Sequence, residues 1–147
     1  MKVLAIASAG GHWIQLLRLQ PAFEGHEVVF ISTKQNFNET VKGREFYAIP
    51  DASRWNKLGL IKVFFTIGKR ISTIKPDVII TTGAAPGLLA ILNGKLRGIK
   101  TIWVDSIANV DELSMSGKLA KLFAGRTYTQ WSHLANESII YSGNIIK

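Results

Sequence analysis

Short apolar runs rich in β-branched residues alternate with helix-length segments along this chain, and that alternation limits the folds it can adopt. Strands are expected at 3–7, 27–32, 46–49, 78–82 and 100–104, with short final strands at Tyr128 and 138–141. Helices are expected through 16–19 up to Pro21, at 57–75, at 86–97 with a proline in the first turn, and at 115–124. Strands that are apolar on both faces and separated by helices are typical of a parallel sheet covered on both sides. The sequence therefore predicts an α/β fold with one doubly wound, Rossmann-like parallel sheet.

Composition favours a single folded domain over residues 1–147. The chain has 147 residues, 47% of them hydrophobic and 19% charged, which excludes a disordered tail or a coiled coil. It has no cysteine, so disulfides, thiolate zinc sites and a thiol nucleophile are excluded. Its three histidines are scattered without paired spacing, so neither a metal site nor a cofactor is expected.

The net charge of +8 is concentrated in the middle of the chain. Between residues 52 and 100 nine basic residues stand against the single acid Asp77. Such a field indicates an anionic partner: nucleic acid, a phosphate-bearing substrate or an acidic membrane surface. Nucleic acid is disfavoured, because the basic stretch belongs to no recognised nucleic-acid module and has no aromatic stacking sheet.

No segment is expected to cross a membrane or to act as a signal peptide. The apolar stretch at 3–9 ends at a glycine pair before it reaches the length of a signal-peptide core. The uncharged stretch at 78–94 contains threonine, glycine and proline and is too short to span a bilayer.

The expected helix at 57–75 carries more apolar residues than packing on a sheet requires. One arc of its helical wheel holds Leu60, Val63, Phe64, Ile67, Ile71 and Ile74. A second arc holds Leu58, Ile61 and Phe65 and borders Lys62 and Lys69. Apolar residues beside lysines are typical of a helix that lies on an anionic membrane surface. The alternative is that this second arc packs on a neighbouring loop.

Ligands of open α/β sheets bind beyond the carboxyl ends of the strands, and three loops of this chain fall there. They are 8–12, 83–86 and 105–106. Gly10 and Gly11 stand directly before a helix, where free N–H groups and the helix dipole suit a phosphate. The dinucleotide fingerprint is absent, since His12 and Gln15 occupy positions that it reserves for glycine, so NAD binding is disfavoured. The alternative is that the glycines only form a tight turn.

His12 and Asp105 are the candidate general bases. His12 lies at the start of a helix, where the positive end of the dipole disfavours the imidazolium form. Asp105 ends an apolar strand and is expected to be partly desolvated. Each also has a structural interpretation, since a lone histidine is usually structural and an aspartate at this place could cap the next turn. Both residues lie on expected loops, so the fold is predicted to survive their replacement.

Five motifs, in this order along the chain, resemble the acceptor-side subunit of split GT-B glycosyltransferases. They are SAGGH at 8–12, PDVIITTG at 76–83, DSIANV at 105–110, LSMSGK at 113–118 and Gln130–Trp131. This family includes the membrane-anchor subunit of the dolichol-pathway UDP-GlcNAc transferase and bacterial PssD-, EpsE- and CpsF-like polysaccharide proteins. The sequence departs from the family pattern at Asp105, usually Glu, and at Asn109, often Arg. The N-terminal membrane helix of eukaryotic members has no counterpart here, because the first strand is expected to begin at Val3.

The resemblance implies that the chain is equivalent to the N-terminal half of a GT-B enzyme such as MurG. It would bind a lipid-diphosphate-linked saccharide acceptor, while a partner subunit supplies the nucleotide-sugar-binding half. The implied acceptor and phosphate-binding residues are Ser8, Gly10, Gly11, Gly83, Ala84 and Ser106. The base would be His12 or Asp105, and the partner would dock near Gln130, Trp131 and 142–147. The protein is expected to lie peripherally on the cytoplasmic face of the plasma membrane. The alternative is a non-catalytic anchor that recruits and activates a complete transferase.

Overall fold

The computed structural model describes residues 1–53 and 55–146 and contains a seven-stranded, fully parallel sheet. Its strands are β1 (Lys2–Ile6), β2 (Glu27–Ser32), β3 (Glu45–Ala48), β4 (Val78–Thr81), β5 (Lys100–Val104), β6 (Arg126–Thr129) and β7 (Ile140–Tyr141). Their order in the sheet is β3-β2-β1-β4-β5-β6-β7. The order reverses at β1, so the predicted doubly wound α/β fold is confirmed. Arg54 and Lys147, part of the basic stretch and of the predicted partner segment, lie outside the described residues.

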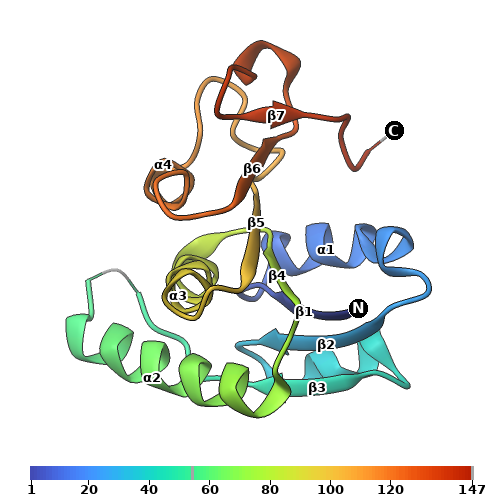
Figure 1. Cartoon of the computed structure of the whole chain (residues 1–147), viewed down its shortest axis with the longest axis vertical. Coiled ribbons are helices and arrows are strands. Elements are labelled where there is room, and N and C mark those ends of the chain that lie inside the picture. The colour runs from blue at the N-terminus through green and yellow to red at the C-terminus, as the bar shows by residue number, and fades with distance from the viewer. Residues whose placement is uncertain (54, 147) are drawn as a thin grey trace.

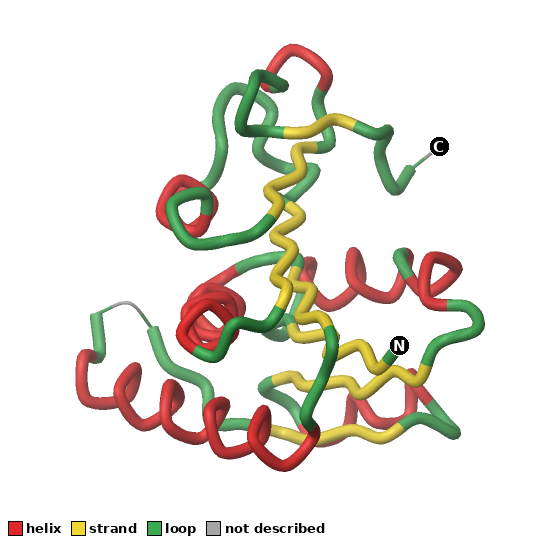
Figure 2. Tube along the Cα trace, in the orientation of Figure 1, coloured by secondary structure: helices red, strands yellow, loops and turns green. Residues whose placement is uncertain are grey.

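Four α-helices and three 3₁₀ helices connect the strands (Figures 1 and 2). The α-helices are α1 (Gly11–Arg18), α2 (Lys57–Ile74), α3 (Ala84–Leu96) and α4 (Met115–Ala120), and the 3₁₀ helices are η1 (Gln20–Phe23), η2 (Gln35–Val41) and η3 (Ser132–Leu134). Figure 1 shows α2 and α3 on one side of the sheet and α1 on the other.

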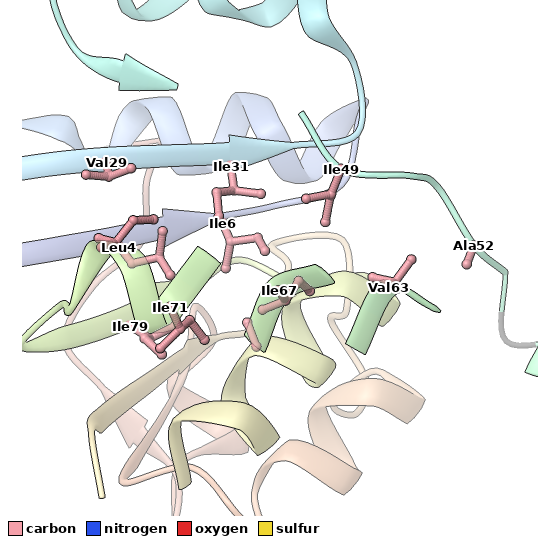
Figure 3. Close-up of a cluster of buried hydrophobic side chains, with 12 residues drawn as sticks. Leu4, Ile6, Val29, Ile31, Ile49, Ala52, Val63, Ile67, Ile71 and Ile79 are labelled. Atoms are coloured by element: carbon pink, nitrogen blue, oxygen red, sulfur yellow. The ribbon is translucent and has the colours of Figure 1, made fainter. Parts of the chain in front are cut away.

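Two apolar clusters, one on each face of the sheet, form most of the core. Between the sheet and α2, residues of β1 and β2 such as Leu4 and Ile31 meet Val63, Ile67 and Ile71 (Figure 3). On the opposite face Trp13 of α1 is buried against alternate residues of the same strands. Because both faces of β1 and β2 are covered, these strands are apolar at nearly every position.

The helix boundaries differ from the sequence expectation where local turn chemistry decides them. The first helix ends at Arg18, and Pro21 lies in η1 instead of ending the helix. Helix α3 begins at Ala84, two residues before the predicted start, because Gly83 turns the chain with a φ of 133°. Helix α4 ends at Ala120, and hydrogen-bonded turns continue to Ala124. The 3₁₀ helix η2 was not predicted, since its sequence QNFNETV has no apolar helical period.

A buried polar contact joins α2 to α3. The Asn93 side-chain amide donates to the carbonyl oxygens of Phe64 (3.1 Å) and Leu89 (3.0 Å), and its oxygen accepts from Arg97 (2.7 Å). Gly68 lets the helices approach, because a Cβ there would lie 2.8 Å from the Asn93 oxygen. These contacts therefore hold α2 against α3, and the outer side of α2 faces solvent.

Candidate functional site

The three loops predicted to carry the site lie together at the carboxyl edge of the sheet. The loops after β1 and β4 meet through His12 and Thr82, whose main-chain and side-chain groups exchange two hydrogen bonds. The loop after β5 joins α1 through Gln15, whose side-chain amide donates to the Ser106 hydroxyl at 2.9 Å. The edge is therefore one connected surface around the point where the strand order reverses.

The His12 ring is held in one orientation by the loop after β4. Its Nδ1 lies 3.0 Å from the carbonyl oxygen of Thr82, and the Thr82 hydroxyl donates to the His12 carbonyl oxygen at 2.6 Å. Because a carbonyl oxygen can only accept, Nδ1 carries the proton in the neutral ring and Nε2 carries the lone pair. Within the described part of the chain Nε2 has no hydrogen-bond partner, so it is available to take a proton from a ligand.

Gly83 forms the surface on which the His12 ring rests. A Cβ at Gly83 would lie 2.8 Å from Nδ1 and 2.9 Å from Cε1 of that ring. The absence of a side chain at this position therefore fixes the place of the imidazole. Sequence reasoning missed the part played by Thr82, because a threonine that ends an apolar strand gives no signal of its own.

Helices α1 and α3 begin without a side-chain cap, in contrast to α2 and α4. Asn56 caps α2 and Ser114 caps α4, whereas Gly10 and Gly83 stand at the cap positions of α1 and α3 with no capping side chain. Gly10 has a φ of 89°, which favours glycine, and both Gly10 and Gly11 are exposed. First-turn N–H groups have no partner inside their helix. In α1 the Trp13 N–H donates to the Gly10 carbonyl oxygen (3.1 Å), whereas the N–H groups of Gly11 and His12 have no hydrogen-bond partner in the described chain. An anionic ligand at Gly11 and His12 stays a prediction.

A cavity of about 320 Å³ adjoins these helix starts. It is lined by 8–9 after β1, 51–53 after β3, 84–86 at the start of α3, and Ser116. Ser8 and Ala84, both predicted site residues, therefore face the same space, whereas Ser106 lies elsewhere and is tied to Gln15. Ala84 adopts a φ of 66°, unusual for a residue with a Cβ and often found where a site requires a special backbone.

Asp105 is buried, and the fold uses all of its hydrogen-bonding capacity. Only 2% of the residue is exposed. One oxygen accepts from the Trp103 indole N–H (2.9 Å) and the Ser114 hydroxyl (2.7 Å). The other accepts from the Ser114 backbone N–H (2.9 Å) and the Asn109 amide (3.0 Å). A carboxylate has about four acceptor positions, so this arrangement suits the capping alternative and leaves no position for a substrate proton.

Gln130 is buried as well, at 3% exposure, and connects four segments. Its amide donates to the Gln15 side chain (2.8 Å) and to the Asp105 carbonyl oxygen (3.0 Å), and its oxygen accepts from the Ile145 N–H (3.2 Å). Its side-chain polar groups are thus all used inside the chain, while the residue also lines the groove described below. A partner contact at Gln130 stays a prediction. Trp131 is half-buried, and its indole N–H donates to the Ile107 carbonyl oxygen at 2.8 Å.

On the α1 side of the sheet β5 is less covered than β4: Ile102 and Val104 are half-buried, whereas Val78 and Ile80 of β4 are buried in the cluster that contains Trp13. Helix α4 packs beside α3 on the opposite face, where Ile91, Trp103 and Ala120 form a third cluster. Two adjoining cavities of about 560 and 410 Å³ lie on the α1 side of these strands, and Ile80 and Ile102 line both. The segment 142–145 closes one end of this apolar groove, which runs along the sheet.

The second arc of α2 is exposed, as its helical wheel predicted. Leu58, Ile61 and Phe65 are 80%, 54% and 68% exposed, and Lys62 and Lys69 are exposed beside them. The arc therefore does not pack on a neighbouring loop of the described chain. No described helix is long and apolar enough to cross a bilayer. The described residues also contain no group of three side chains that could hold a metal ion.

Solved structures with the same fold include a MurG protein and several UDP-GlcNAc 2-epimerases. MurG of Acinetobacter baumannii matches with a TM-score of 0.78 and 17% identity, covering 97% of this chain and 45% of that one. A UDP-GlcNAc 2-epimerase of Methanocaldococcus jannaschii matches with a TM-score of 0.75 and 17% identity, over 98% of this chain and 47% of that one. The chain thus corresponds to about half of each of these two proteins, and at these identities the likeness concerns the fold.

Sequence relatives carry a more specific name. The UDP-N-acetylglucosamine transferase subunit ALG14 of Rattus norvegicus is 28% identical over 98% of this chain and 82% of the relative. The corresponding subunit alg14 of Schizosaccharomyces pombe is 34% identical over 60% of this chain and 42% of the relative. The family model described as oligosaccharide biosynthesis protein Alg14 like matches residues 34–145. That match confirms the resemblance to split GT-B subunits: this chain belongs to the Alg14-like family of oligosaccharide biosynthesis proteins.

Proposed function

We propose that this chain is the acceptor-binding, membrane-associating subunit of a two-component glycosyltransferase. The enzyme would transfer a sugar from a nucleotide diphosphate sugar to a lipid-diphosphate-linked saccharide. The observation that carries the proposal is the site at the carboxyl edge, where an oriented imidazole stands beside two helix starts without side-chain caps. The relatives named as transferase subunits support the same activity.

The chemistry assigned to His12 follows from its orientation. Nε2 accepts the proton of the acceptor hydroxyl as that oxygen forms a bond to the anomeric carbon of the donor sugar. The bond from that carbon to the nucleotide diphosphate breaks, and the partner subunit holds the departing diphosphate. The N–H groups of Gly11 and His12 hold the acceptor diphosphate, because they have no hydrogen-bond partner in the described chain and lie at the positive end of the α1 dipole. Asp105 supports the loop and takes no proton.

The partner is proposed to dock along the apolar groove over β4, β5 and β6. GT-B enzymes such as the matched MurG contain a further half that the chain does not cover, and the segment 142–145 lies directly at the groove. Half-buried apolar residues such as Ile102 and Val104 offer the desolvated area that stable subunit interfaces use. Trp131 stays a candidate contact at the edge of this surface.

The exposed arc of α2 is proposed to bind the cytoplasmic leaflet of the plasma membrane. Each inserted apolar side chain contributes roughly 1.5–3 kcal/mol, and each lysine near an anionic surface about 1 kcal/mol. The binding free energy therefore has an apolar part, from Leu58, Ile61 and Phe65, and an electrostatic part of comparable size, from Lys62 and Lys69. Salt screens only the electrostatic part.

A vesicle experiment tests the membrane part of the proposal. The variant Phe65→Ser, Lys62→Glu, Lys69→Glu should stay folded and lose co-sedimentation with vesicles that contain phosphatidylserine. The matched control Leu96→Ser, Lys95→Glu, Lys121→Glu makes the same change in charge and apolarity at other exposed positions and should still bind. Equal co-sedimentation of wild type and the α2 variant would contradict the membrane proposal. The basic residues of α2 would then be expected to bind the acceptor or the partner.

Reconstitution tests the catalytic part. The chain alone should transfer no sugar, and the complex with its nucleotide-sugar-binding partner should do so. Gly11→Val should weaken acceptor binding without unfolding the chain, since a Cβ at Gly11 meets no atom within 4 Å. Ala135→Val, on an exposed loop away from the edge, is the control. Full transfer by the partner alone would instead favour a non-catalytic anchor that only recruits it.

A further inference from the structure

We propose that the cavity between the ends of β1 and β3 and the start of α3 binds the saccharide of the acceptor, with Asp51 accepting from its hydroxyl groups. This inference rests on the proposed function, because it names the part of the acceptor that one region of that site recognises. Its starting point is a set of four polar side chains around this cavity, of which only Ser8 was predicted from the sequence to bind the acceptor.

The four side chains are Asp51, Ser53, Ser8 and Ser116, which come from three separate segments and face one cavity. Within the described part of the chain none of their side-chain oxygens has a hydrogen-bond partner. Together they offer one carboxylate that only accepts and three hydroxyls that both donate and accept. A cavity of about 320 Å³ is at the small end of ligand pockets, whose volumes run from about 300 to 1,000 Å³.

The charge of the cavity decides which part of the acceptor it suits. Among the described residues that line it, Asp51 is charged and none is basic. A carboxylate repels a phosphate and accepts hydrogen bonds from hydroxyl groups. The acceptor diphosphate therefore belongs at Gly10 and Gly11, and the uncharged, hydroxyl-rich portion belongs at Asp51.

The rest of the lining fits a sugar ring. Ala84, Ala85 and Pro86 give an apolar wall, against which the C–H groups of a pyranose can pack while its hydroxyls reach the polar side. The cavity begins at Ser8 and Ala9, directly before the glycine pair, so a saccharide here is adjacent to a diphosphate at the start of α1. Asp51 thus sets the direction in which the acceptor enters and discriminates a glycosylated lipid diphosphate from a bare one.

Two probes separate this subsite from the diphosphate site: a short prenyl diphosphate bearing one N-acetylhexosamine, and the same prenyl diphosphate without sugar. Binding of each to the full chain in detergent micelles is measured by calorimetry for the wild type, Asp51→Asn and Asp111→Asn. The wild type should bind the glycosylated probe about 10-fold more tightly, the difference that one or two hydrogen bonds supply. Asp51→Asn should reduce this preference several-fold without weakening the bare probe, because the neutral amide is a weaker acceptor and offers one accepting oxygen in place of two. Asp111→Asn, exposed and outside the cavity, should keep the preference.

Three other results of this experiment would contradict the saccharide subsite. An unchanged preference in Asp51→Asn overturns the saccharide subsite and leaves the diphosphate site standing. Equal weakening of both probes also overturns it, because Asp51 would then act on the site as a whole. If the wild type binds neither probe, the proposed acceptor function fails together with the subsite.

Discussion

His12 and Asp105 both lie in segments that follow strands of the sheet, and both were predicted as candidate bases, yet the fold gives their side chains opposite surroundings. His12 has one ring nitrogen bonded to Thr82, and its other nitrogen has no partner in the described chain. Asp105 accepts from Trp103, Asn109 and Ser114 through both oxygens. Position at a strand end therefore identifies the edge of the sheet where ligands bind. The hydrogen bonds that a side chain makes within the protein then show whether it is free to bind a ligand or serves to stabilise a loop.

The largest expected effect is on stability, at Asp105. Asp105→Ala leaves the buried indole N–H of Trp103 and the donors of Ser114 and Asn109 without an acceptor, at a cost of about 1–3 kcal/mol for each unsatisfied group. The free energy of unfolding, measured by urea titration, should fall by about 3 kcal/mol or more. This replaces the sequence-based prediction that the fold survives changes at Asp105. A loss below about 1 kcal/mol would mean that the loop rearranges and that the capping role is minor.

The next effect should appear in catalysis, at His12. His12→Ala should lower the turnover of the reconstituted pair by at least about 100-fold, or about 2.7 kcal/mol, because the proton acceptor is removed. Its unfolding free energy should change by less than that of Asp105→Ala. The control His133→Ala alters an exposed histidine of η3 and should keep full turnover. Near-normal turnover of His12→Ala would remove the histidine from the mechanism.

A smaller effect is expected when the support of the ring is changed. Gly83→Ala places a Cβ 2.8 Å from Nδ1 of His12 and should lower turnover by about 10-fold by moving the ring. Gly98→Ala is the matched control, since Gly98 also has a positive φ (68°) but a Cβ there meets no atom within 4 Å. Both variants place a Cβ at a positive φ, so turnover is measured on the folded fraction of each protein, and only Gly83→Ala should lower it. Equal turnover would show that the position of the ring is not critical.

The smallest expected effect concerns Ala84. Ala84→Gly should raise the unfolding free energy by about 0.5 kcal/mol, since glycine relieves a left-handed backbone that costs about 1–2 kcal/mol but loses more entropy on folding. Ala85→Gly, one residue further into α3, should instead lower it by up to about 1 kcal/mol. Thermal unfolding of the two variants side by side measures the difference in sign.

The sequence was sufficient for the fold and for the outer side of α2, because both depend on regular patterns. Apolar runs located the first five strands, while the last two were indicated only by Tyr128 and 138–141. A helical wheel separated the buried Val63 and Ile67 from the exposed Leu58 and Phe65. The roles of Asp105 and Gln130 could not be obtained in this way. Their partners come from several loops, and Gln15 and Gln130, which share a hydrogen bond, are 115 residues apart in the chain. Contacts between residues so far apart in the chain leave no periodic pattern in the sequence.

For the same reason, the sequence predicted only part of the candidate site. Gly10, Gly11 and His12 form a short motif that can be recognised in the chain, and the structure places them at an open helix start. Thr82 lies in the motif at 76–83, but its contact with His12 appears only when β4 is placed beside β1. Asp51 belongs to none of the five motifs, and its place in the cavity appears only when the sheet is assembled. Whether His12 acts as the base stays a prediction.

The central position of β1 also determines the order in which the sheet can be completed during synthesis. Val3 pairs with Val28 on one side and with Val78 on the other. At about 5–20 residues per second, β4 leaves the ribosome seconds after β2. During that interval the apolar edge of β1 has no neighbour, and an unpaired strand edge is a template for association with other chains. The nascent protein should therefore depend on a chaperone until α2 and β4 have emerged, and a slowly translated α2 should favour aggregation.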